Sequence, residues 1–149
     1  MNEEIENTLY REELTLASIK KRALASIVDE FLLSFLLIIA LWDSFINAQT
    51  TEEIINLSNN FVMEYIFMKI VYQAFFTMQY GATIGKIVMK IKVVDLKTLS
   101  NPNVFSSLNR AIFRIVSETF FYLGFLWGML EPAKRTWHDK TAKTLVVNA

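Results

Sequence analysis

Two adjacent carboxylates, Asp29 and Glu30, interrupt an otherwise apolar run over residues 23–42. An ionised carboxylate in the hydrocarbon layer of a membrane costs at least about 2.5 kcal/mol, so such a group is expected to be paired, hydrated or protonated. Asp29 or Glu30 could bind and release a proton or a cation beside Lys69 and Gln73 of a second apolar run, and we expect Asp29 to be the group that titrates. The alternative is a polar clamp that joins two helices without any transport. The two side chains project about 100° apart on a helix, so we expect them to have different partners.

Three further charged residues have spacings that predict their roles. Arg22 precedes Asp29 by two helical turns, about 10 Å along the axis, which is too far for direct pairing. We expect Arg22 at the mouth of the polar site. Arg114 and Glu118 are four residues apart and could pair along one helix.

Two other motifs suggest acid–base catalysis and phosphate binding, but each lacks residues that such a site requires. His138-Asp139 could hold an imidazole for acid–base work, yet no nucleophile lies beside it, and a turn leading to the last strand explains it better. The segment 81–86 resembles a phosphate-binding loop but lacks the Walker spacing and a preceding strand. We expect it to be a turn where a span leaves the membrane, with Thr83 capping a short helix that begins at Ile84.

The composition favours a membrane protein without catalytic activity. The chain has 149 residues, of which 53% are hydrophobic, and its mean hydropathy is positive. Fifteen basic and fifteen acidic residues cancel, so nothing suggests a nucleic-acid partner. The chain has no cysteine and one histidine, which argues against disulfides and a metal site. We therefore expect no enzyme, no metal and no cofactor.

Two segments are long and apolar enough to span a membrane. They cover residues 23–46 and 61–80, and the polar segment 47–60 between them is expected to be a short loop. Basic segments at 20–22 and 86–97 are placed in the cytoplasm by the positive-inside rule, and the loop, which has no lysine or arginine, is placed outside. Segment 1–19 is rich in acidic residues and is expected to be a short surface helix or a disordered tail. We expect it on the cytoplasmic side, and we expect no cleaved leader.

The segment 104–130 has two alternative interpretations. The β-branched runs 91–94 and 144–147 are typical of paired strands. If they pair, 104–130 must return to the cytoplasmic side, as an interfacial helix over about 104–118 and a re-entrant or tilted segment around Gly124 and Gly128. Arg110 and Arg114 suit an interface. The alternative is a third plain span with an external C-terminus.

These motifs together resemble the RDD family of bacterial membrane proteins over about residues 20–147. The resemblance rests on Arg22, Ala25 and Asp29, the 81–86 turn leading into 91–95, Asn109-Arg110 with Arg114, and the segment 135–144. It implies that Arg22 is the family's arginine, Asp29 its first aspartate and Asp139 its second. The implied motif residues are Gly81, Thr83, Gly85, Lys86, Arg110, Arg114, His138 and Asp139. The chain departs from the family pattern at Ile84, often proline, and at Lys143, often glycine.

The sequence therefore predicts an all-α integral membrane protein with two to three transmembrane helices, an interfacial helix and a small cytoplasmic two-stranded β-element. An acidic segment, 1–19, precedes an RDD membrane domain, 20–147. The resemblance implies a multi-pass protein of the bacterial inner (plasma) membrane that acts in transport of an unknown ligand. Two or three helices cannot enclose a pathway, so we expect a homo-oligomer or a larger membrane partner. The expected function is an oligomeric transporter or a proton/cation exchange component; the alternative is a non-transporting accessory or scaffold protein.

Overall fold

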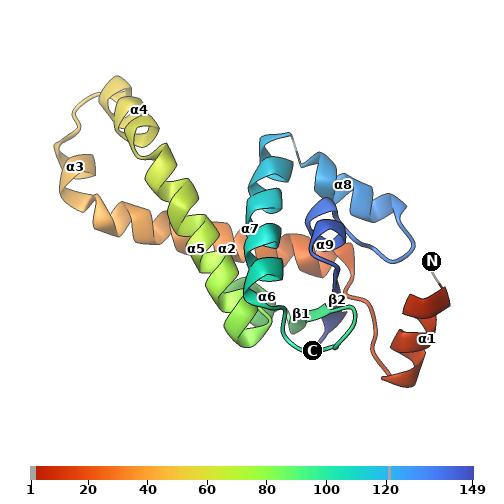
Figure 1. The fold of residues 1–149 in the computed structure, drawn as a ribbon. Coiled ribbons are helices and arrows are strands. Elements are labelled where there is room, and N and C mark those ends of the chain that lie inside the picture. The colour runs from red at the N-terminus through yellow and green to blue at the C-terminus, as the bar shows by residue number, and fades with distance from the viewer. Residues whose placement is uncertain (1–2, 121) are drawn as a thin grey trace.

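A computed structural model describes residues 3–120 and 122–149, and it is mostly helical (Figure 1). A two-stranded antiparallel sheet accompanies the helices, as predicted. The elements in chain order are α1 (Glu3–Arg11), α2 (Ile19–Ala40), α3 (Trp42–Asn47), α4 (Thr51–Asn60), α5 (Val62–Tyr80), α6 (Ile84–Val88), β1 (Ile91–Asp95), α7 (Val104–Thr119), α8 (Leu123–Leu130), α9 (Trp137–Thr141) and β2 (Thr144–Asn148).

Helix α2 is the strongest candidate for a membrane span. The Ser18 side chain caps its first turn by accepting a hydrogen bond from the Lys21 backbone N–H. The helix has 22 residues, about 33 Å at 1.5 Å per residue, and it is long and apolar enough to cross a membrane. The helix is offset from the predicted span 23–46, because capping by Ser18 starts it at Ile19 and a break at Leu41 ends it.

The segment 47–60 is not the predicted loop. Most of it forms α4, whose first turn is capped by the Thr50 hydroxyl, which accepts from the Glu53 N–H at 3.2 Å. Glu52 and Glu53 also complement the positive end of the helix dipole. Polar composition alone suggested a loop, whereas the capping residues define a helix. Taken together, α4 and the apolar α5 are long and apolar enough for one broken span or a re-entrant loop, with a bend of 50° between them.

Helix α5 agrees with the predicted segment 61–80 to within one residue. It ends at Gly81, whose φ of +69° is a left-handed conformation that favours glycine. A Cβ at this position would also lie 2.6 Å from the Asn101 side-chain oxygen. The Gly81 carbonyl accepts a hydrogen bond from the Val93 N–H at 2.7 Å, which ties the end of α5 to β1.

The sheet forms the core at one end of the molecule. Val93 lies opposite Val146, and both pack with Ala17 and Ala25 beside α2. The other face of the sheet packs on α1 through Ile5, so α1 is a docked helix and not a disordered tail. In Figure 1, α3 and α4 lie at the opposite end of the molecule from the sheet.

Segment 104–130 is divided into two helices. Helix α7 covers the residues for which the sequence predicted an interfacial helix, and the chain then reverses direction into α8 (Figure 1). The reversal includes Tyr122 at a φ of +60°. Gly124 lies against Ser117 of α7, and Gly128 lies against Thr136. The structure therefore does not have one continuous helix over 104–130, which a third plain span would require.

Candidate functional site

Nine mostly buried charged side chains gather between α2, α5, α6, α7 and α9. The five cations are Arg22, Lys69, Lys86, Arg110 and Arg114, and the four carboxylates are Asp29, Glu30, Glu118 and Asp139. We call these nine residues the charge cluster. It includes most of the side chains that the sequence singled out, and it falls into three parts: one around Asp139, one around Asp29 and one around Lys69.

Asp139 is the centre of the first part. Its carboxylate forms ion pairs with Arg22 of α2 and Arg110 of α7, and it accepts from the Thr136 backbone N–H at 3.0 Å and the Thr136 hydroxyl at 2.8 Å. Burial alone would raise the pKa of Asp139, but the two guanidinium groups outweigh it and hold that pKa well below the usual range. The ionised carboxylate therefore joins α2, α7 and α9.

The adjacent His138 is buried and neutral. Burial holds its pKa well below the ordinary value, because desolvation opposes the charged imidazolium. Its Nε2 lies 2.9 Å from the Thr136 hydroxyl, and its Nδ1 has no hydrogen-bond partner among the described residues. The turn that the sequence predicted here is the short helix α9, directly before β2.

Asp29 is held by three hydrogen-bond donors. It accepts from the Tyr72 hydroxyl at 2.7 Å, the Thr83 hydroxyl at 2.7 Å and the Gly85 backbone N–H at 2.8 Å. The Thr83 residue precedes α6, as predicted, but its hydroxyl serves Asp29 and not the helix end. A Cβ on Gly85 would lie 2.1 Å from the Ala25 carbonyl oxygen, so α6 can approach α2 this closely only through glycine. Asp29 thus fastens α2 to α5 and α6.

Lys69 is the centre of the third part. Its ammonium contacts both Glu30 of α2 and Glu118 of α7. Arg114 donates from Nε to Glu118 at 3.0 Å, which is the pairing that the spacing predicted, and it lies 3.9 Å from Glu30. The Tyr65 hydroxyl donates to Glu30 at 2.8 Å. Of the two adjacent carboxylates, Glu30 is therefore the one that contacts Lys69, and the expectation of different partners agrees with the structure.

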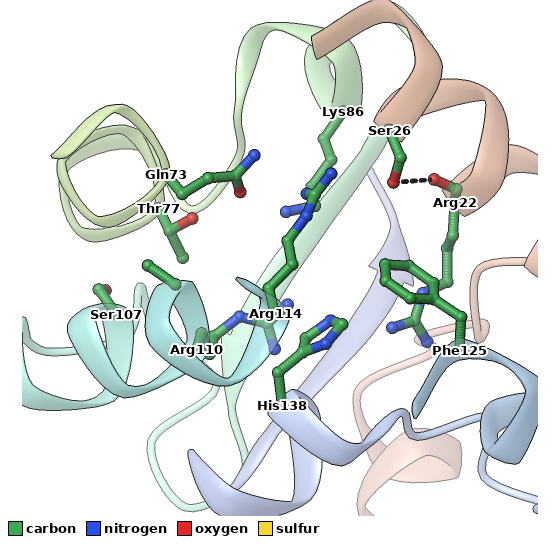
Figure 2. Close-up of a pocket in the computed structure, with 11 residues that line it drawn as sticks. Arg22, Ser26, Gln73, Thr77, Lys86, Ser107, Arg110, Arg114, Phe125 and His138 are labelled. Carbon is green, nitrogen blue, oxygen red and sulfur yellow. Dashed lines mark hydrogen bonds between the residues drawn. The ribbon is translucent and has the colours of Figure 1, made fainter. Parts of the chain in front are cut away.

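A small cavity of about 20 Å³ lies between these parts. Figure 2 shows side chains from α2, α5, α6, α7, α8 and α9 converging on it. The lining residues are Arg22, Ser26, Gln73, Thr77, Lys86, Ser107, Arg110, Ala111, Arg114, Phe125 and His138. Gln73, which the sequence placed beside the carboxylates, faces this cavity instead.

Several partners were not singled out from the sequence. Tyr65 and Tyr72 looked like ordinary apolar residues of a span, and the Asp139 pairs join residues up to 117 positions apart. A signal was available for Thr136, because a threonine three residues before an acidic residue is typical of a capping box, which α9 has. Within the described part of the chain, no three His, Asp or Glu side chains are placed to hold a metal ion.

Comparison with known proteins agrees with the resemblance noted in the sequence. The search of curated proteins and the search of solved structures give no match. The sequence model of the RDD family matches residues 16–143, which is most of the chain and includes Arg22, Asp29 and Asp139. Together with the apolar helix α2, this match indicates a membrane protein, and the chain belongs to the RDD family.

Proposed function

We propose that the chain crosses the bacterial inner membrane twice, through α2 and the bent pair α4–α5. Support comes from large apolar side chains that point away from the protein along both helices. Phe31 and Phe35 of α2 are 74% and 61% exposed, and Phe67 of α5 is 69% exposed. Exposed apolar surface of this extent is typical of contact with lipid or with another protein.

Within that arrangement, the chain acts as a proton/cation exchange component of an oligomeric transporter. The observation that favours this function is the position of Glu30, the twelfth of the 22 residues of α2 and therefore near mid-membrane. Its side chain is 32% exposed although it pairs with Lys69, and it lines an apolar groove together with Phe31 and Phe125. Ionisable groups at such depth are unusual and are commonly part of ion or proton pathways.

The exchange step follows from the shared ammonium of Lys69. When Glu30 takes up a proton it loses its charge, and Lys69 then pairs with Glu118 alone. When the proton leaves, the Glu30 carboxylate is free to pair with Lys69 or with an entering cation. Protons and cations compete for one carboxylate in this scheme, which needs no catalytic step and no cofactor.

Two spans cannot enclose a pathway, so the scheme requires further copies of the chain or a larger membrane partner. The groove beside Glu30 opens to the outside of the monomer between α2 and the α7–α8 pair. A neighbouring subunit on this side would complete the wall of the pathway.

Flux measurements on two neighbouring carboxylate variants test the function. The purified protein is reconstituted in liposomes with an internal pH-sensitive dye, and gradients of Na⁺, K⁺ or Li⁺ are applied. We expect cation-driven proton movement with the wild type and none with Glu30→Gln, because the amide cannot be protonated and released. The matched variant Asp29→Asn is expected to lower the melting temperature, because Asp29 fastens helices. Equal exchange by wild type and Glu30→Gln for every cation, or no exchange by the wild type, would refute the proposal.

A second candidate function is a non-transporting accessory or scaffold protein. It is favoured by Asp29, whose carboxylate accepts hydrogen bonds from three donors. Polar contacts of this kind hold helices together, and they can keep a surface in the shape that a partner binds. This alternative predicts no flux from any variant. It also predicts that Asp29→Asn lowers the recovery of an oligomer or complex in size-exclusion chromatography.

A further inference from the structure

The small cavity within the charge cluster is lined by basic groups. Arg22, Lys86, Arg110 and Arg114 all line it, and among the described residues that surround it there is no carboxylate. From this arrangement we propose that the cavity binds a monoatomic anion of the size of chloride. This inference is independent of the exchange step, because Glu30 and Lys69 do not line the cavity.

Lys86 supplies the positive charge that lacks a partner. It is buried, and no hydrogen bond or ion pair joins it to another described residue, although the nearby carboxylates of Asp29 and Asp139 favour its charged form. The other cations of the cluster are all engaged: Arg22 and Arg110 with Asp139, and Lys69 and Arg114 with Glu30 and Glu118. Five cations face four carboxylates, so one bound monovalent anion would neutralise the cluster.

An unpaired donor also faces the cavity. The side-chain nitrogen of Gln73 is buried and has no partner among the described residues. A buried N–H group without a partner is costly, and a bound anion would accept from it. Figure 2 shows the Gln73 amide on α5 and Lys86 on α6 approaching the space beside the guanidinium of Arg114. Ligand donors thus come from three different helices.

The size of the cavity selects the anion. A volume of about 20 Å³ corresponds to about one or two water molecules. A halide ion fits such a space, whereas phosphate, sulfate or a lipid headgroup does not. Burial weakens competition from bulk water, and the surrounding donors are already in place.

The electrostatics of Lys86 agree with an anion site. Burial, together with repulsion from Arg110 and Arg114, lowers the pKa of Lys86 to about 7. An anion beside Lys86 would stabilise the ammonium. Binding is therefore expected to be accompanied by uptake of a proton and to weaken above neutral pH. The other charged groups that act on Lys86 are Asp29 on α2 and Asp139 on α9; Arg22 on α2 lines the same cavity, and His138 is neutral.

Thermal unfolding in detergent tests the site. The full-length protein is heated in sodium chloride and in sodium gluconate at the same ionic strength and pH 6.5. We expect chloride to raise the melting temperature in a saturable manner, by about 5 °C at a hundredfold excess over its Kd. Lys86→Met is expected to lose this shift, and the control Lys97→Met, at an exposed position, is expected to keep it. A shift that is equal in wild type and Lys86→Met, or one caused by inorganic phosphate but not by chloride, would overturn the proposal.

Crystals of the wild type grown with bromide give a test that does not depend on a variant. We expect anomalous scattering from one bromide ion between Lys86 and Gln73. Absence of that scattering at saturating bromide would contradict the site even if Lys86→Met fails to fold. Because the variant Glu30→Gln leaves the cavity intact, it is expected to keep the chloride shift, which separates failure of this inference from failure of the exchange scheme.

Discussion

At the scale of single residues, the protein keeps many charges out of water by pairing almost all of them. The clearest case is Asp139, which forms ion pairs with both Arg22 and Arg110, because all three side chains are buried. Removal of one partner from such a set leaves an uncompensated charge and typically costs about 3–5 kcal/mol. The pairing also joins residues that lie 117 positions apart in the chain.

Lys86 gives a prediction for the pH dependence of stability. Its pKa is about 7 in the folded protein because of burial and the nearby Arg110 and Arg114, against about 10.4 in an unfolded chain. Between these two values the unfolded state binds a proton that the folded state does not, so stability should rise with pH from about 7 to about 10. Melting temperatures in chloride-free buffer at pH 7, 8 and 9 would show this rise. Lys86→Met should flatten it and Lys97→Met should not; an identical slope in all three proteins would count against a buried Lys86.

Sequence reasoning found most residues of the charge cluster but few of their partners. The Arg114–Glu118 pair was predictable, because a spacing of four residues fixes two side chains on one helix face. The contact of Arg22 with Asp139 joins segments 117 residues apart, and no local rule gives that distance. Likewise, Glu30 and Asp29 are adjacent in sequence, and only the packing of α5 and α7 decides which of them contacts Lys69.

At the scale of elements, apolar length and strand composition predicted the two long helices and the pairing of β1 with β2. Predictions failed where a local cap overrides composition. Thr50 starts α4 within a polar segment, and the break at Leu41 ends α2 within an apolar one. Helix ends depend on a few capping hydrogen bonds, whereas helix existence depends on a long apolar pattern.

The crossing of α2 and α6 gives a prediction for one glycine. Gly85→Ala would place a Cβ 2.1 Å from the Ala25 carbonyl and 2.9 Å from the Asp29 carboxylate, so the two helices must separate. We expect a large fall in melting temperature, corresponding to about 3 kcal/mol or more, because backbone atoms cannot move aside as a side chain can. Gly128→Ala is a suitable control, since its nearest atom is the Thr136 methyl at 3.0 Å and its effect should be smaller. Equal melting temperatures for Gly85→Ala and wild type would show that the helices do not cross this closely.

At the scale of the whole molecule, one small sheet joins the ends of both proposed spans. The Ala17 N–H, just before α2, donates to the Val146 carbonyl of β2 at 3.0 Å. The Gly81 carbonyl, just after α5, accepts from Val93 of β1 at 2.7 Å. The start of α2 and the end of α5 therefore lie at the same end of the molecule, and α3 with α4 lies at the other end (Figure 1). In a membrane, this connection places the sheet, α1 and the C-terminus on one side.

Topology reporters test that arrangement. Alkaline phosphatase, which is active only outside the cytoplasm, and a fluorescent protein that matures in the cytoplasm are fused in turn before Met1, after Gln49 and after Ala149. The basic segments beside the sheet predict cytoplasmic signals from both terminal fusions. The fusion after Gln49, between α3 and α4, should give phosphatase activity. The expected pattern requires β1 and β2 to share a compartment, because an antiparallel pair cannot form across a bilayer. Opposite compartments for the two termini would mean that a membrane-inserted chain cannot keep the sheet, and with it the burial of Asp139 beside Arg22 and Arg110.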